Sequence, residues 1–237
     1  MLLILSSLNV SFANSSFKAT SLGITTESFL LASTFISSLV TKNEGSISIC
    51  GVDIDENFPL AKSKLGVVNQ EFNFSQFEKV QDVIMGQAGY YGVDPKTAAE
   101  KTEHYLKKLG IWDKRDVFIR ELSGGQKRRV MIIKALIHEP ELLILDEPTA
   151  GVDIELRRGL WDFLIEINNA GTTIILTTHY LEEAENLCRN IAIIDNGTII
   201  ENTKMDSLLQ QLENQIFTIE TDNPSDLHER GLAKQSY

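Results

Sequence analysis

Residues 142–149 read Leu-Leu-Ile-Leu-Asp-Glu-Pro-Thr, an apolar run that ends in the acid pair Asp146 and Glu147. A short, continuous apolar run is typical of a strand buried on both faces, as in a parallel sheet. Open α/β sheets bind ligands at the carboxyl ends of their strands, so we expect the acid pair at a ligand site. Asp146 is a candidate Mg²⁺ ligand, and Glu147 could orient or deprotonate a water that attacks a phosphate. The plain alternative is a strand end followed by a solvated acidic turn.

A second informative stretch lies upstream, where residues 122–126 read Leu-Ser-Gly-Gly-Gln. Ser123 is a suitable N-cap for a helix that we expect to end near residue 138. A helix N-terminus presents free N–H groups and a positive dipole end, and glycines allow close approach. Ser123, Gly124, Gly125 and Gln126 therefore form a candidate phosphate site. An ordinary helix cap is the alternative interpretation, and the two are compatible.

Strands and helices alternate along most of the chain. The patterns predict strands at 46–50, 65–68 and 172–178, helices at 94–110, 154–169 and 181–189, and a hairpin at 191–200 that turns at Asn196-Gly197. This alternation predicts an α/β fold with a parallel sheet. Gln70 and His179 each follow a predicted strand, where an amide oxygen could join a Mg²⁺ shell and an imidazole could contact a phosphate or position the attacking water. Each of these two residues has an ordinary loop role as its alternative.

Composition and charge argue against several classes of function. The net charge of −11 over 237 residues argues against a nucleic-acid partner, because the densest basic patch is only Lys127-Arg128-Arg129. Cys50 and Cys188 lack the spacing of a metal site. No apolar run reaches the length of about 18 residues that a membrane span needs. The apolar first nine residues lack the basic start of a signal peptide, so we do not expect export.

Several motifs together resemble those of ABC transporter ATPase subunits. Gln70, residues 122–126, 142–148 and 150–153, and His179 are similar, in this order, to the Q-loop, signature, Walker B, D-loop and H-loop, and the match covers about residues 37–212. Residues 149–153 and 177–184 resemble the exporter-type branch for multidrug or polysaccharide export. The resemblance implies an α/β, P-loop NTPase-like ABC ATPase domain with a parallel-sheet core, an antiparallel β portion and a helical subdomain at about residues 71–122.

The resemblance also implies a site, cofactors and partners. Such subunits dimerise head to tail, as homo- or heterodimers, around two ATP molecules with Mg²⁺. They dock on a separate membrane permease at the cytoplasmic face of the membrane, here through about residues 71–120. By this resemblance, the catalytic residues are Glu147 and His179, the metal ligands are Asp146 and Gln70, and the ATP contacts are Ser123, Gly124, Gly125, Gln126, Gln70 and Asp153.

One family motif is absent from the sequence. A phosphate-binding P-loop reads G-x-x-x-x-G-K-S/T, and no such run occurs. It would fall at residues 23–31, where Phe29 replaces the phosphate lysine. We therefore divide the chain into an atypical segment, 1–36, an ABC ATPase domain, 37–213, and a short tail, 214–237. The ATP site of this chain is expected to be defective, although its signature could still serve an intact partner subunit.

Three other interpretations stay open. The chain could be a non-hydrolysing pseudo-ATPase, a fragment of a damaged gene, or an ABC ATPase that takes no part in transport. The last is the weaker one, because basic nucleic-acid surfaces and long coiled-coil heptads are both absent.

Overall fold

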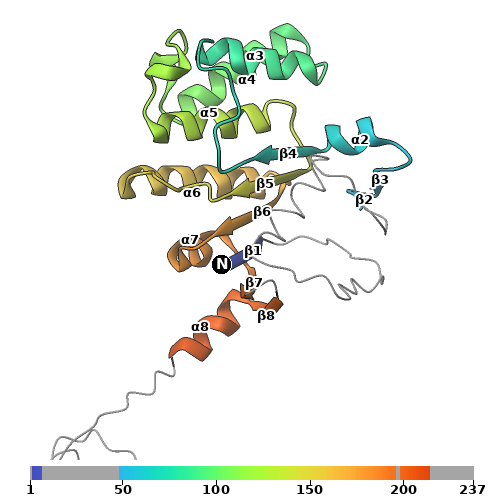
Figure 1. Ribbon diagram of the computed structural model, residues 1–237, viewed down its shortest axis with the longest axis vertical. Coiled ribbons are helices and arrows are strands. Elements are labelled where there is room, and N and C mark those ends of the chain that lie inside the picture. The colour runs from blue at the N-terminus through green and yellow to red at the C-terminus, as the bar shows by residue number, and fades with distance from the viewer. Residues whose placement is uncertain (1, 7–47, 196–197, 214–237) are drawn as a thin grey trace, which may run out of the picture. The chain divides into compact units, whose positions relative to one another are not determined.

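The computed structural model describes residues 2–6, 48–195 and 198–213 (Figure 1). The chain separates into two units, Met1–Met205 and Asp206–Tyr237. The described part of the second unit, residues 206–213, belongs entirely to helix α8, Met205–Glu213. The first unit contains the main sheet and every candidate site residue.

The first unit is built on a mixed six-stranded sheet in the order β4-β5-β6-β1-β7-β8. The strands are β1 Leu2–Ser6, β4 Leu65–Val68, β5 Leu142–Asp146, β6 Thr173–Thr178, β7 Asn190–Asp195 and β8 Thr198–Lys204. Strands β4, β5 and β6 are parallel, whereas β1 is antiparallel to both of its neighbours and β7 forms an antiparallel hairpin with β8. The predicted α/β class, with a parallel core and an antiparallel portion, is confirmed. The hairpin turn at residues 196–197 lies outside the described residues.

Strand β1 was not predicted from the sequence. It lies between β6 and β7, and both of its edges form backbone hydrogen bonds. The apolar N-terminal segment has no clear strand period, so its sequence did not indicate this pairing. Leu2 pairs with Thr178 and Ser6 with Ile174, so β1 runs opposite to β6. The chain therefore leaves β1 at the edge of the sheet remote from Asp146. The P-loop window at residues 23–31 lies outside the described residues.

Helices on the sheet follow the predicted pattern closely. Helix α5, Gly124–Leu136, packs against β4, and α7, Leu181–Leu187, packs against β6 (Figure 1). Helix α6 spans Ile154–Asn169, the predicted range. The short elements β2 Ser48–Ile49, β3 Val52–Asp53 and α2 Phe58–Ser63 complete the described part before β4. Strand β2 confirms part of the strand predicted at 46–50, whereas β3 and α2 were not predicted.

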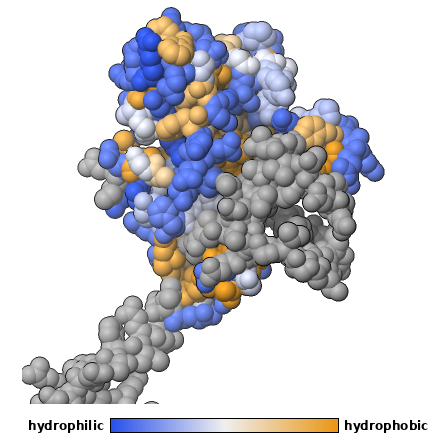
Figure 2. All heavy atoms as spheres, viewed as in Figure 1, coloured by the Kyte–Doolittle hydropathy of each residue, from blue (hydrophilic) through white to orange (hydrophobic). Residues whose placement is uncertain are grey.

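A largely helical region connects β4 to α5. It contains α3 Val80–Tyr90, α4 Pro95–Lys108 and the 3₁₀ turns η1 Trp112–Lys114 and η2 Ile119–Glu121. Asp94 caps α4 as predicted, accepting hydrogen bonds from the amides of Lys96 and Thr97. Helix α3 was not predicted individually, because it begins without a capping side chain. Figure 2 shows mainly hydrophilic residues on the visible face of this region, with smaller hydrophobic patches among them.

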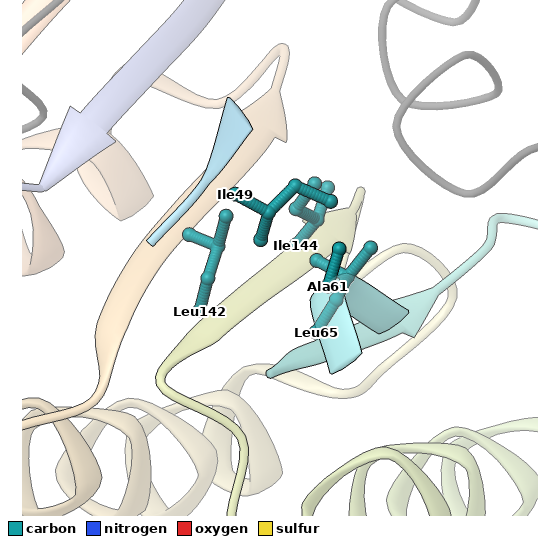
Figure 3. Close-up of a cluster of buried hydrophobic side chains, with 5 residues drawn as sticks. All are labelled: Ile49, Ala61, Leu65, Leu142 and Ile144. Atoms are coloured by element: carbon teal, nitrogen blue, oxygen red, sulfur yellow. The ribbon is translucent and has the colours of Figure 1, made fainter. Parts of the chain in front are cut away.

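The core next to the parallel strands is apolar and tightly enclosed. Figure 3 shows one cluster, formed by Ile49, Ala61, Leu65, Leu142 and Ile144. All five side chains are buried, and they come from β2, α2, β4 and β5. Four of the five residues of β5 are buried, which confirms the prediction from its continuous apolar run. None of the described helices is long and apolar enough to cross a lipid bilayer.

Candidate functional site

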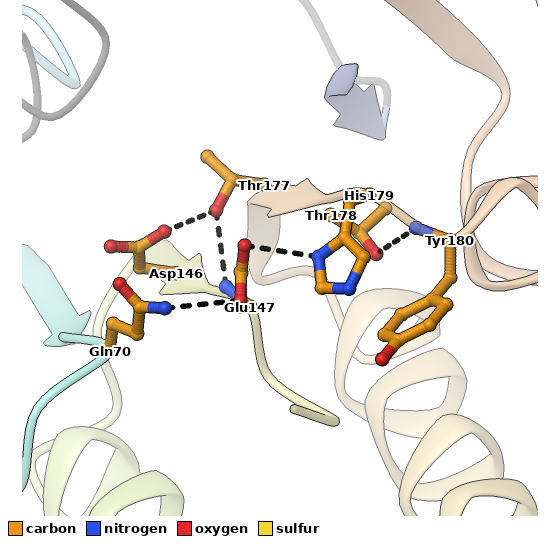
Figure 4. A network of polar contacts seen from close by, with 7 residues as sticks. All are labelled: Gln70, Asp146, Glu147, Thr177, Thr178, His179 and Tyr180. Carbon is orange, nitrogen blue, oxygen red and sulfur yellow. Dashed lines mark hydrogen bonds and ion pairs between the residues drawn. The ribbon is translucent and has the colours of Figure 1, made fainter. Parts of the chain in front are cut away.

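Three parallel strands carry the predicted site residues to one edge of the sheet. Gln70 follows β4, the acid pair ends β5, and His179 follows β6 (Figure 4). Because the carboxyl ends of parallel strands share an edge, residues far apart in sequence meet here. The structure thus brings together Gln70, Asp146, Glu147 and His179, which we call the acid cluster.

Glu147 lies at the centre of the acid cluster. Its Oε2 accepts a hydrogen bond of 3.2 Å from the amide Nε2 of Gln70, and its Oε1 lies 3.1 Å from Nδ1 of His179 (Figure 4). The backbone φ of Glu147 is +48°, in the left-handed region that non-glycine residues seldom adopt. Such strain persists where surrounding contacts hold it, and it is frequent at functional sites. The carboxylate of Glu147 is therefore held between residues from two other strand ends.

Thr177 fixes the acid pair from the neighbouring strand. Its Oγ1 donates to Oδ1 of Asp146 and accepts a 3.1 Å hydrogen bond from the backbone N–H of Glu147. The same N–H also donates to the Thr177 carbonyl oxygen. Thr177 is buried, and in the sequence it served only to mark the resemblance to the exporter-type branch. The signal that could have found it is its position at the end of β6, opposite Asp146 in the parallel register.

The donor atoms of the acid cluster suit Mg²⁺ bound together with a nucleotide. Mg²⁺ in such sites is held by one or two carboxylates, while waters and phosphate oxygens supply the remaining ligands. Asp146 provides a carboxylate, and the amide oxygen of Gln70 faces the same side (Figure 4). Within the described residues, no group of three or more His, Cys, Asp or Glu side chains could hold a metal ion on its own.

The Ser123–Gln126 stretch forms a well-defined helix start. The Oγ of Ser123 accepts from the N–H of Gln126 at 3.3 Å, and the Gln126 side chain accepts from the N–H of Ser123 at 3.0 Å. This reciprocal pair is a capping box, which leaves the N–H groups of Gly124 and Gly125 without an intrahelical acceptor. No hydrogen bond among the described residues joins this stretch to the acid cluster. The predicted phosphate contacts of Ser123, Gly124, Gly125 and Gln126 stay predictions.

Asp153 is exposed at the start of α6, and its side chain makes no capping hydrogen bond. The preceding residue, Val152, is buried beside Gly125, and its carbonyl accepts a 2.9 Å hydrogen bond from Nε of Arg157. The D-loop therefore lies against the helix start that carries Ser123. Its predicted contact with ATP stays a prediction.

Comparison with known proteins gives the family. The family model described as ABC transporter matches residues 29–150. The chain belongs to this family. It is 38% identical over 175 residues to the Nod factor export ATP-binding protein I of Cupriavidus metallidurans, a match that covers 72% of this chain and 56% of the relative. It is also 38% identical to the linearmycin resistance ATP-binding protein LnrL of Bacillus subtilis, over 72% of this chain and 55% of that one.

Three further findings concern the fold and the extent of the match. A solved ATP-binding subunit of an ABC transporter superposes with a TM-score of 0.72 at 21% identity, over 99% of this chain and 100% of that one, which supports the same fold. The chain spans about half the length of the curated relatives it matches. The match to the family model begins at residue 29, near the end of the window in which the P-loop motif is missing.

Proposed function

We propose that this chain is an energy-coupling ATPase subunit of an export system, which works with ATP and Mg²⁺ and with a membrane permease. Its membership of the ABC transporter family supports the ATP chemistry. Relatives named for Nod factor export and linearmycin resistance support the export branch.

The observation that carries this proposal is the presence of two half-sites on one chain, the capped helix start and the acid cluster. The capped helix start presents the N–H groups of Gly124 and Gly125, but no hydrogen bond among the described residues connects it to the acid cluster. The acid cluster holds Glu147 between Gln70 and His179, at the carboxyl ends of three strands. A head-to-tail dimer would place the signature of one subunit against ATP held by the other. Were ATP bound beside the acid cluster, Asp146 and Gln70 would hold the metal, and Glu147, with His179, would orient or deprotonate the attacking water.

The direction of β1 supports the role of signature donor to an intact subunit. A P-loop connects the carboxyl end of a parallel strand to a helix, which places its N–H groups at the ligand edge of the sheet. Strand β1 ends at the other edge, since Ser6 pairs with Ile174. We therefore propose that Ser123–Gln126 serves ATP bound by a second, intact subunit.

The surface around the start of the helical region supports docking to a permease. Phe77 is 74% exposed and Phe72 is 41% exposed, both inside the range 71–120. Exposed aromatic side chains of this kind are typical of binding surfaces. Docking there would place the chain at the cytoplasmic face of the membrane, as a peripheral subunit.

Binding of ATP with Mg²⁺ to a purified Glu147→Gln variant, in which hydrolysis cannot deplete the ligand, tests the site of this chain. We expect no saturation up to millimolar ATP, because charge-assisted contacts to phosphate are worth about 1.5–3 kcal/mol each and the lysine that supplies one is absent. Micromolar binding would instead mean that the chain supplies a phosphate cradle of another kind and can act as a homodimer.

The ATPase rate of the chain paired with an intact subunit tests the signature. Ser123→Arg should abolish the stimulated rate, since it places a bulky cation where the phosphate would lie. Ser63→Arg, at an exposed serine of α2, is the matched control. An unchanged rate with Ser123→Arg would contradict the role of signature donor and favour a damaged gene product.

A further inference from the structure

The segment 69–78, which we call the Gln70 loop, connects β4 to α3 and is attached to the chain on both sides of the signature. Upstream of the signature, the N–H of Ile119 donates to the carbonyl of Glu78 at 3.0 Å, and that of Arg120 donates to the carbonyl of Gln76 at 3.1 Å. These two contacts hold the far end of the loop only a few residues before Ser123. They are backbone contacts, so they do not depend on side-chain identity.

Downstream of the signature, side chains of α5 hold the near end of the same loop. Arg128 donates from Nη1 to the carbonyl of Asn69 at 2.6 Å and from Nη2 to the carbonyl of Gln70 at 3.0 Å. Lys134 reaches the carbonyl of Asn73 at 3.4 Å. The guanidinium of Arg128 also lies 5.8 Å from the ring centroid of Phe72, within cation–π range. The Gln70 loop is therefore hydrogen-bonded to the chain on both sides of the signature, and Arg128 makes the shortest of these contacts.

Arg128 is an unusual residue in this position. It is only 3% exposed, and none of the ion pairs among the described residues includes it. Its Nε has no hydrogen-bond partner within the described part of the chain. Burial lowers the pKa of its guanidinium, and the charges of Asp146, Glu147 and Glu183 oppose that effect. A buried cation that bonds backbone carbonyls instead of a carboxylate fixes the path of the main chain, because the fork of guanidinium donors has a rigid geometry.

We propose that Arg128 is a positioning residue that couples the Gln70 loop to the signature, so that a displacement of the loop moves Ser123–Gln126. The two carbonyls that it binds belong to Gln70 itself and to the residue before it, and Arg128 lies in the second turn of the helix that Ser123 caps. The loop also carries the exposed Phe72 and Phe77. A partner that contacts these rings would therefore shift the signature without any ATP in the site of this chain. This consequence rests on the function proposed above, whereas the coupling itself is a property of the single chain.

Hydrogen exchange of the purified chain, measured without nucleotide, tests the coupling. Arg128→Met removes both carbonyl contacts and leaves an apolar side chain at a buried position. We expect exchange in residues 69–78 and 123–127 to rise together by about tenfold or more, because hydrogen bonds to charged groups are among the stronger contacts and local opening follows their loss. Exchange in β5 and β6 should stay unchanged. Arg129→Met is the matched control, since within the described part of the chain Arg129 donates to the Leu109 carbonyl, and loss of this bond should affect residues near 109.

Two results with Arg128→Met would overturn the proposal. Unchanged exchange in either 69–78 or 123–127 with Arg128→Met would show that the loop and the signature are not coupled through this side chain. An equal rise in β5 and β6 would show a general structural role. Should Arg128→Met fail to fold, Arg128→Lys keeps the charge but offers a single donor group, and we expect a smaller rise confined to the same two segments. A flat profile with Arg128→Lys in that case would also overturn the proposal. The measurement needs neither ATP nor a partner, so its failure leaves the proposed function standing, and a failed ATPase test leaves the coupling standing.

Discussion

Gly66 controls how closely β4, which leads into the Gln70 loop, approaches the helix that follows the signature. A Cβ at this position would lie 2.5 Å from the carbonyl oxygen of Ala135, and 3.0 Å from both Leu143 Cδ1 and Pro140 Cγ. The nearest atom belongs to the α5 backbone, so no side-chain rotation can relieve the contact. We therefore predict that Gly66→Ala separates β4 from α5 and destabilises the chain.

The magnitude follows from two opposing effects. Overpacking a well-filled core costs about 1–3 kcal/mol, and a contact with backbone belongs at the upper end, near ~3 kcal/mol. Replacing glycine also removes freedom from the unfolded chain, which stabilises by about 0.4–1 kcal/mol. The expected net loss in the free energy of unfolding is about 2 kcal/mol.

Gly86→Ala is the matched control. Gly86 lies inside α3, and no atom lies within 4 Å of the position that a Cβ would take there. Alanine is preferred to glycine in a helix interior by about 1 kcal/mol, so this variant should be more stable than the wild type. Urea unfolding followed by circular dichroism measures both changes, which should differ by about 3 kcal/mol. A Gly66→Ala variant within about 0.5 kcal/mol of the wild type would contradict the steric argument, since surface substitutions commonly fall in that range.

Three further changes have calculable outcomes. Thr177→Val should lower the free energy of unfolding, measured by urea unfolding, by about 2 kcal/mol, because Asp146 and the Glu147 N–H lose the buried hydroxyl that they contact. Thr177→Ser keeps the hydroxyl, so its free energy of unfolding should fall much less. Burial lowers the pKa of His138 below its ordinary 6.5, so as the pH falls below 6.5 the unfolded chain binds the proton before the folded chain does, and the free energy of unfolding decreases. His138→Phe should reduce this dependence of the free energy of unfolding on pH, which urea unfolding at several pH values measures. Asp94→Ala should destabilise by about 1 kcal/mol through loss of the α4 cap, and thermal unfolding should show Asp94→Asn close to the wild type.

Much of the fold follows from local sequence. The continuous apolar run of β5, the Asp94-Pro95 start of α4 and the Ser123 cap of α5 all adopt the predicted elements, because their signals lie within a few residues. Helices α3 and α2 escaped prediction, as α3 has no capping side chain and α2 is only six residues long. Tertiary packing, not local propensity, stabilises such elements.

For the candidate site, the positions of the residues were predictable from the sequence, but their contacts were not. The positions of Gln70, Asp146, Glu147 and His179 after predicted strands were sufficient to expect them at one edge of a parallel sheet. Their actual contacts were not predictable, since Glu147 is held by residues 77 and 32 positions away along the chain.

The amino-acid sequence was sufficient for the α/β class, the family motifs and the absence of a P-loop run, because each is written in the type and spacing of neighbouring residues. The folded chain was needed to show that β1 runs antiparallel between β6 and β7, that Thr177 holds the acid pair, and that Arg128 bonds the carbonyls of Asn69 and Gln70. Strand direction and buried hydrogen bonds depend on which distant segments meet, and a backbone carbonyl has no residue type by which a sequence could reveal its partner.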